Sequence, residues 1–233
     1  AYAAMSAADA VVFGKAEATS TSVGPGQTVS VDTLNGGDVM SISGSAGASN
    51  SAVGNVGTIN SGGWQDVYGY GVGNVTTMNA NGWQNVHSGG TGNVTTMNGG
   101  GQTVNKSGIG TVTTMNNGTQ VVNLGGIGTV STIVGGEQDV AADGTGIINI
   151  MNGGTQGIDA ETAKGTITSM TAGLQRIVGT GTVDTMSGGT QDVQYGSGTV
   201  TTMNGGEQIV SDRATGTVET MNSGTQLLSS GGS

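Results

Sequence analysis

The sequence predicts an all-β fold, a single-stranded right-handed parallel β-helix (β-solenoid) of about ten rungs of 18 residues. One phrase recurs along the chain, as in GTVTTMNNGTQVV (110–122) and GTVTTMNGGEQIV (198–210). Gly makes up 48 of the 233 residues, with a single Pro and no collagen-like Gly period. Each repeat holds two β-favouring runs separated by Asn-Gly or Gly-Gly turn signals. Two such runs per repeat fit one coil of a solenoid.

Two columns of residues set the register of the repeat. The first is an apolar position that is Met in most copies, at intervals of 16 to 19 residues, and the second is a Gln five residues further on. Gln65 and Gln84 are displaced by one residue from this spacing. The glutamines that keep it are Gln102, Gln120, Gln138, Gln156, Gln175, Gln191, Gln208 and Gln226. In several copies Val follows two positions after the Gln, so we expect the Gln side chains to face inward and to bond as a ladder from rung to rung.

The columns around the Met predict which side chains fill the interior. The position three residues before the Met is Val or Ile in every copy, as at Val112, and is expected to be buried. The position one residue before it, as at Thr114, has the same parity in a strand as Val112 and is also expected to face inward. The position between them admits Asp184 and Glu219, so it is expected to face solvent. Keeping both Val112 and Met115 inside requires a bend before the Met.

The two ends of the chain lack the full repeat. Residues 1–26 are Ala-rich and are interpreted as an N-terminal cap or exchanged segment, and residues 27–233 as the solenoid. Because each rung is stabilised by its neighbours, the end rungs of a solenoid leave unpaired strand edges. The apolar residues at these ends, which are the candidate assembly residues, are Val11, Val12, Phe13, Leu227 and Leu228.

Composition and charge exclude several classes of partner. Fifteen acidic residues against five basic ones give a net charge of −10, which repels nucleic acid and anionic lipid. No apolar run approaches the roughly 20 residues that a membrane helix requires, so we expect no membrane insertion of this chain, and no signal peptide is visible. Cys is absent. The sequence predicts no cofactor and no metal ion.

The phrase Thr-Val-x-Thr-Met-Asn-Gly-Gly-x-Gln-x-Val, repeated at 18 to 19 residues over about 53–228, resembles the repeats of AIDA-type self-associating autotransporter adhesins. The resemblance implies a right-handed β-helical passenger that is secreted or displayed on the surface of a Gram-negative bacterium. It also implies a role in cell aggregation, biofilm formation and attachment, with heptose added to Ser or Thr in some members.

An aromatic cluster is the main candidate for a binding site. If the glutamines that follow the two tryptophans are in register, Trp64 stacks on Trp83 and Tyr68 on His87, all facing outward, with Tyr70 close by. Exposed aromatic rows bind the faces of sugars, here on host or matrix glycans, or a protein partner. They equally stabilise a sheet as cross-strand pairs. His87 has no companion ligands in the sequence, so metal binding is not expected there.

The outward column that follows the Gln contains carboxylates without forming a continuous row of them. Asp66, Asp139 and Asp192 lie in this column, and Gly157 and Arg176 interrupt it. Arg176 is expected beside Asp192. We interpret the column as ordinary solvated surface.

These observations favour a non-enzymatic adhesive or structural protein that associates with itself. A sharper alternative is a subunit of an extracellular filament, assembled by end-to-end stacking of rungs with exchange of the N-terminal segment. A polysaccharide-processing β-helix would need convergent acids or a basic residue poised near acids, and here these residues are expected to be scattered. Ice binding would use the column from Thr77 to Thr220, which the parity argument places inside.

Overall fold

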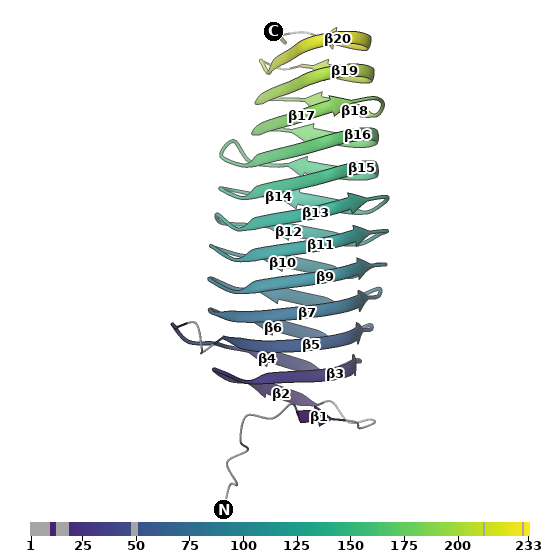
Figure 1. Cartoon of the computed structure of the whole chain (residues 1–233). Coiled ribbons are helices and arrows are strands. Elements are labelled where there is room, and N and C mark those ends of the chain that lie inside the picture. The colour runs from purple at the N-terminus through teal and green to yellow at the C-terminus, as the bar shows by residue number, and fades with distance from the viewer. Residues whose placement is uncertain (1–9, 13–18, 48–50, 212, 230) are drawn as a thin grey trace, which may run out of the picture.

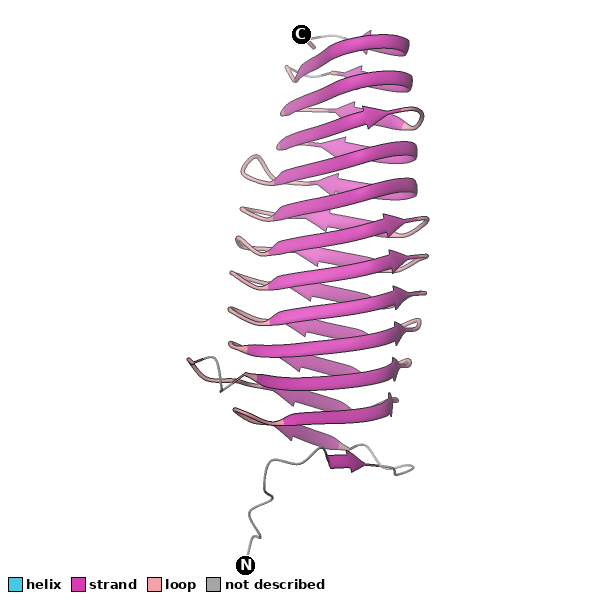
Figure 2. Ribbon diagram, in the orientation of Figure 1, coloured by secondary structure: helices cyan, strands magenta, loops and turns pink. Residues whose placement is uncertain are grey.

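The protein is a rod-shaped β-solenoid, as predicted (Figures 1 and 2). The computed structural model describes residues 10–12, 19–47, 51–211, 213–229 and 231–233. The chain makes about 11 turns of roughly 18 residues, and the described residues contain no helix. In that part of the chain there is accordingly no helix long and apolar enough to cross a membrane.

Each coil contributes strands to two faces of the rod. The first, here called the Met face, contains β1 (Ala10–Val12), β3 (Thr28–Leu34), β5 (Ala52–Ile59), β7 (Gly71–Met78), β9 (Thr91–Met97), β11 (Ile109–Met115), β13 (Ile127–Ile133) and β17 (Thr180–Met186). The second, here called the Gln face, contains β2 (Ser20–Val23), β4 (Val39–Ile42), β6 (Trp64–Val67), β8 (Trp83–Val86), β10 (Gly101–Val104), β12 (Thr119–Val122), β14 (Glu137–Val140) and β18 (Thr190–Val193). Four longer strands run through both faces: β15 (Thr145–Ile158), β16 (Lys164–Ile177), β19 (Ser197–Val210) and β20 (Thr215–Leu228).

Successive coils stack in parallel, with like residues in register. Val112 pairs with Val130 on the Met face, and Gln102 pairs with Gln120 on the Gln face. In Figure 1 the near strands run from left to right while the coils rise toward the C-terminus, so the winding is right-handed. Equivalent side chains of every coil therefore form columns along the axis of the rod.

Side chains from both faces fill the interior. The Met face contributes the Val and Met columns and the Gln face contributes the Gln and the apolar residue two positions later, as at Val112, Met115, Gln120 and Val122, all of which are fully buried. Burial of the apolar columns supplies the hydrophobic stabilisation of each rung. Stacking of like shapes favours close packing of these narrow rungs.

A Gly column explains part of the high Gly content. Gly110 is buried on the Met face and points toward the Gln face. A Cβ added at Gly110 would lie 2.6 Å from Gln102 Oε1 and closer still to Val104 Cγ2. The same contact with a Gln and a Val recurs at Gly128 and Gly146. Only a residue without a side chain leaves room there for the inward Gln and Val.

The bend between the Val and Met columns is present, but the Thr at the bend faces outward, contrary to the prediction. Val112 and Met115 are buried, whereas Thr113 and Thr114 between them are not. Ile150, which occupies the Thr114 column, is 44% exposed. Two successive outward side chains break the two-residue alternation and turn the chain. Parity counted through the bend therefore placed the Thr column on the wrong side.

The segment before residue 27, predicted to be a cap or exchanged segment, contains strands that pair with the solenoid. β1 pairs in parallel with β3, and β2 pairs in parallel with β4. Val23 of β2 is 1% exposed and belongs to the core. The segment before residue 27 thus contributes two strands to the stack. Phe13 lies outside the described residues, and exchange of this segment stays a prediction.

Candidate functional site

The predicted aromatic pairs stack on the outer surface of the Gln face, at β6, β8 and the turns that follow them. Trp64 and Trp83 have ring centroids 6.0 Å apart and planes at 19°, and Tyr68 and His87 have centroids 4.4 Å apart and planes at 4°. Tyr70 lies in the same turn as Tyr68 and is 59% exposed. We call these five residues the aromatic patch.

The register of the patch follows from the glutamines beside it. Gln65 pairs with Gln84, and Gln84 pairs with Gln102. The extra residue between Met78 and Gln84 therefore lies in the turn and leaves the Gln column unbroken. Because Gln65 and Gln84 point inward, the tryptophans that precede them point outward.

A polar pair lies between the two aromatic stacks. Asp66 and Asn85 are paired in register, and Asn85 Nδ2 donates to Asp66 Oδ1 at 3.0 Å. His87 Nε2 lies 3.5 Å from the same oxygen, and it is buried without a hydrogen-bond partner among the described residues. Among those residues no hydrogen bond reaches Asp66 Oδ2 or Asn85 Oδ1. The outward positions along β6 and β8, continued to the first residue after each strand, are thus aromatic, polar and aromatic.

The ring of Trp83 rests against the next rung. A Cβ added at Gly101 would touch Trp83 Cζ3 and lie 2.7 Å from Cη2 and 2.8 Å from Cε3. Gly101 is buried although it occupies an outward position in register with Trp83. The absence of a side chain at Gly101 therefore allows the indole to lean over the sheet.

The glutamines form a continuous buried ladder. From Gln84 to Gln226, each Nε2 donates to Oε1 of the Gln one rung earlier, at 2.6 to 2.7 Å. Most also donate to a backbone carbonyl across the rung, as Gln102 does to Gly92 O at 3.1 Å. These bonds satisfy amides that would otherwise be costly to bury. The ladder is therefore a structural element, and it leaves no reactive amide.

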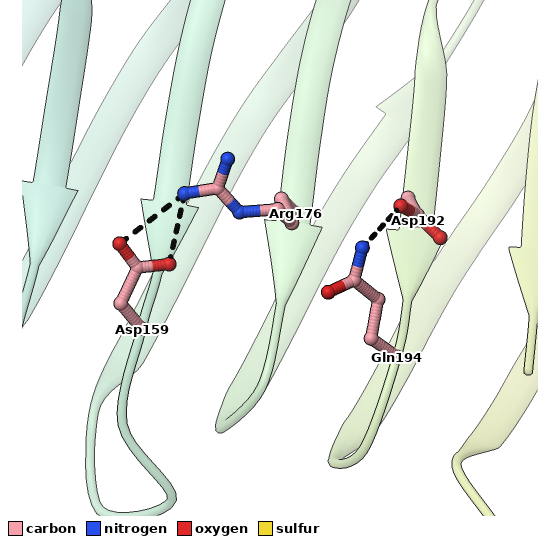
Figure 3. A network of polar contacts seen from close by, with 4 residues as sticks. All are labelled: Asp159, Arg176, Asp192 and Gln194. Atoms are coloured by element: carbon pink, nitrogen blue, oxygen red, sulfur yellow. Dashed lines mark hydrogen bonds and ion pairs between the residues drawn. The ribbon is translucent and has the colours of Figure 1, made fainter. Parts of the chain in front are cut away.

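Arg176 and its neighbours depart from the expected pairing. Arg176 is in register with Asp192, but its Nη2 turns to Asp159 and donates to both carboxylate oxygens, at 3.0 and 3.2 Å (Figure 3). Asp192 instead accepts from Gln194 Nε2 at 2.9 Å. Gly157 is in register with Arg176 in the preceding rung, and because it has no side chain it leaves the path of the guanidinium to Asp159 open.

Asp139 joins the same cluster from the preceding rung. Its Oδ1 is buried without a hydrogen-bond partner among the described residues. Partial burial, followed by the neighbouring charges of Asp159 and Glu137, raises the pKa of Asp139, and Arg176 opposes this rise. The acids here are gathered around one base, contrary to the prediction of scattered charges. The Arg176 guanidinium pairs with Asp159.

A second exposed cluster was not found from the sequence. Ile109 and Ile127 are neighbours in register at the start of β11 and β13, and they are 47% and 42% exposed. Leu124, in the turn before Ile127, is 60% exposed. The same outward column has Thr91 and Thr145 in the adjacent rungs. We call Ile109, Leu124 and Ile127 the apolar strip. The feature of the sequence that could have indicated it is the presence of two Ile residues in a largely polar column.

The candidate assembly residues within the described part of the chain lie in β1 and β20. Val11 and Val12 belong to β1, which pairs with β3. In β20, Leu227 is 46% exposed and Leu228 is 58% exposed. Within the described residues, no group of three or more His, Cys, Asp or Glu could hold a metal ion.

Comparisons with known proteins give one informative match. No family model matches the chain, and no curated protein matches it. The crystal structure of a TibC-catalysed, hyper-glycosylated fragment of TibA, residues 55 to 350, is similar to this chain with a TM-score of 0.71 and 27% sequence identity. The match covers 91% of this chain and 82% of the TibA fragment.

TibA is an autotransporter adhesin passenger of AIDA type, and the match supports the family resemblance of the repeats. The match also supports an adhesin-like β-solenoid.

Proposed function

We propose that this chain is a non-enzymatic adhesive solenoid, secreted or held on a bacterial surface, whose molecules associate with one another. The likeness to an adhesin passenger supports the adhesive class. The apolar strip supports self-association, because Ile109 and Ile127 are exposed neighbours in register and Leu124 is exposed in the turn before Ile127. Exposed apolar patches rimmed by polar residues are typical of protein interfaces.

The strip offers an experiment in which folding and association separate. Thr occupies the Ile109 column at Thr91 and Thr145, so Ile109→Thr and Ile127→Thr place a residue that the fold already accepts. We expect the parent chain to self-associate at high concentration in sedimentation velocity, and the double variant to remain monomeric with an unchanged melting temperature.

Ile150→Thr is the matched control for this experiment. Ile150 is 44% exposed and stands in a column of Thr, in the rung next to Ile127 but five residues further along the strand than the strip's column. Its substitution removes the same chemical group without touching the strip, so association should persist. A strictly monomeric parent chain at high concentration would overturn the proposed function, and equal association by all three proteins would exclude the strip.

End-to-end stacking into a filament is the alternative mode of association. It would use the strands at the two ends of the stack, with Leu227 and Leu228 exposed in β20, because an unpaired parallel strand accepts another strand. In this mode, deletion of residues 1–13 should abolish filaments seen by electron microscopy while the β-sheet signal in circular dichroism stays. Filaments that persist in the truncated chain would rule out exchange of the N-terminal segment.

The outward Thr column reopens ice binding as a weaker candidate. The column that was expected inside lies at the surface, but it is half-buried and contains Ile150 and Ser169. The fully outward column beside it is broken by Asp184 and Glu219. A regular hydroxyl array is therefore interrupted. A thermal hysteresis assay tests this function directly, and a measurable freezing-point gap would favour it over adhesion.

A further inference from the structure

We infer that the aromatic patch, with the polar pair Asp66 and Asn85, is a binding site for an uncharged oligosaccharide. This inference builds on the proposed adhesive function and adds a ligand to it. The patch holds both tryptophans and the single His of the chain, on two adjacent rungs. Such a concentration is not required for the fold, because the equivalent outward positions of β12 and β14 are Thr119 and Glu137.

The chemistry of the patch matches a sugar. Sugars present apolar C–H surfaces, which contact aromatic rings, and hydroxyl groups, which need both donors and acceptors. Trp64 is 37% exposed and Tyr68 is 41% exposed, so each stack offers aromatic surface. Between the stacks, Asp66 Oδ2 and Asn85 Oδ1 are acceptors without a hydrogen bond among the described residues, and the Asn85 amide is a donor.

The site is held rigid before any ligand binds. Its side chains stand on paired strands, and each is fixed by a neighbour: Trp64 by Trp83, Tyr68 by His87, and Asp66 by Asn85. A pre-organised site loses little conformational entropy on binding. The outward positions on one strand repeat every two residues, so Trp64 and Tyr68 are about 13 Å apart along the strand. A chain of more than one sugar unit is needed to contact both stacks.

Charge selects an uncharged ligand. The outward positions of β4, β6, β8 and β10 include no Lys or Arg, and Lys106 lies only in the turn after β10. Asp66 puts a carboxylate at the centre of the patch, and the whole chain has a net charge of −10. An anionic glycan would therefore be repelled. A second copy of the chain, docked on the same patch by two-fold symmetry, would bring two Asp66 carboxylates together.

Intrinsic fluorescence provides a direct test, because both tryptophans of the chain are in the patch. The full chain is titrated with uncharged hexose oligosaccharides, namely cello-, malto-, laminari- and chito-oligosaccharides, and with alginate oligosaccharides as the anionic arm. We expect a saturable change in Trp emission with at least one uncharged series, a longer oligomer to bind more tightly than a disaccharide, and no change with alginate. Glucan binding would indicate a matrix-type ligand and chito-oligosaccharide binding an N-acetylated cell-surface ligand.

Two variants and one control complete the test. Asp66→Ala and Tyr68→Ala should each weaken binding by about tenfold or more, the loss expected when one aromatic or charged hydrogen-bonding contact is removed. Tyr195→Ala removes a Tyr that is 64% exposed outside the patch and should bind as the parent does. Melting temperatures identify any variant that fails to fold. In that case the binding of the other patch variant decides whether the patch is the oligosaccharide site.

Sedimentation velocity on the same proteins keeps this inference separate from self-association. Glycan binding that is lost in the patch variants while association persists supports the inference. No saturable emission change with any uncharged series overturns it and leaves the proposed self-association intact. Loss of association in Asp66→Ala and Tyr68→Ala, without glycan binding by the parent, would show that the patch is instead a protein interface.

Discussion

Gln120 Nε2 donates to Gln102 Oε1 at 2.6 Å, and Gln120 Oε1 accepts from Gln138 Nε2 at 2.7 Å. Replacing Gln120 by Leu would leave one acceptor of Gln102 and one donor of Gln138 unpaired in the core. Each such group costs about 1–3 kcal/mol, so we expect a loss of about 2–6 kcal/mol in the free energy of unfolding. Urea unfolding, with hydrogen exchange of the rungs around β12, measures this loss.

Gln194→Ala is the matched control for the ladder. Gln194 is half-buried at the surface and donates only to Asp192 within the described residues. Its loss should change the free energy of unfolding by well under 1 kcal/mol. Similar losses in the two variants would contradict the view that the amide ladder stabilises the core.

The Gly column predicts a steric effect that differs between two glycines. At Gly110 a Cβ would crowd Gln102 and Val104, so Gly110→Ala should cost about 1–3 kcal/mol of stability through overpacking. At Gly36, which is exposed, the nearest atom to a Cβ would be Ser61 O at 3.4 Å. Gly36→Ala should be neutral or slightly stabilising. Thermal unfolding compares them, and equal melting temperatures would be inconsistent with the buried contact at Gly110.

Asp139 predicts a stability effect that depends on pH. Its pKa is raised in the folded chain, chiefly by burial and then by Asp159. The carboxylate therefore binds a proton more tightly in the folded chain than in the unfolded chain. The contribution of Asp139 to the free energy of unfolding is therefore fully present below about pH 3.8, the ordinary pKa of an Asp. It is lost as pH rises through the raised pKa of the folded chain. We expect Asp139→Asn to be more stable than the parent at neutral pH, with the difference closing in acid.

Melting temperatures across this pH range test the prediction, with Asp184→Asn as a control for net charge at an exposed site. Arg176 lowers the pKa of Asp139, so Arg176→Gln should enlarge the benefit of Asp139→Asn. A benefit that is the same at neutral and acid pH would mean that the carboxylate of Asp139 is not the cause.

The repeat could be predicted from the sequence because inward positions must match from rung to rung. This constraint identified the Val112, Met115 and Gln120 columns, and it also placed Trp64 on Trp83. It did not determine the side on which Thr114 lies, because a bend lets two successive residues face outward.

Side-chain contacts between rungs could not be predicted from the sequence either. Arg176 is in register with Asp192, yet its long side chain reaches Asp159 in an earlier turn. Register fixes the position of a backbone and leaves the direction of a flexible side chain open. The Ile109 and Ile127 neighbours were overlooked for a different reason, since only the structure places that column on the surface.

Leu124 combines backbone strain with exposure, and this combination gives the last prediction. Its φ of 51° lies in the left-handed region, which costs a non-Gly residue about 1–2 kcal/mol, while its side chain is 60% exposed in the apolar strip. Leu124→Asn should therefore raise the free energy of unfolding by about 0.5–1 kcal/mol, because Asn tolerates this conformation better. If the strip is the interface between molecules, the same substitution should weaken self-association, so stability and association move in opposite directions. Thermal unfolding and sedimentation velocity on one protein sample measure both, and a stabilised variant that associates as strongly as the parent would remove Leu124 from the interface.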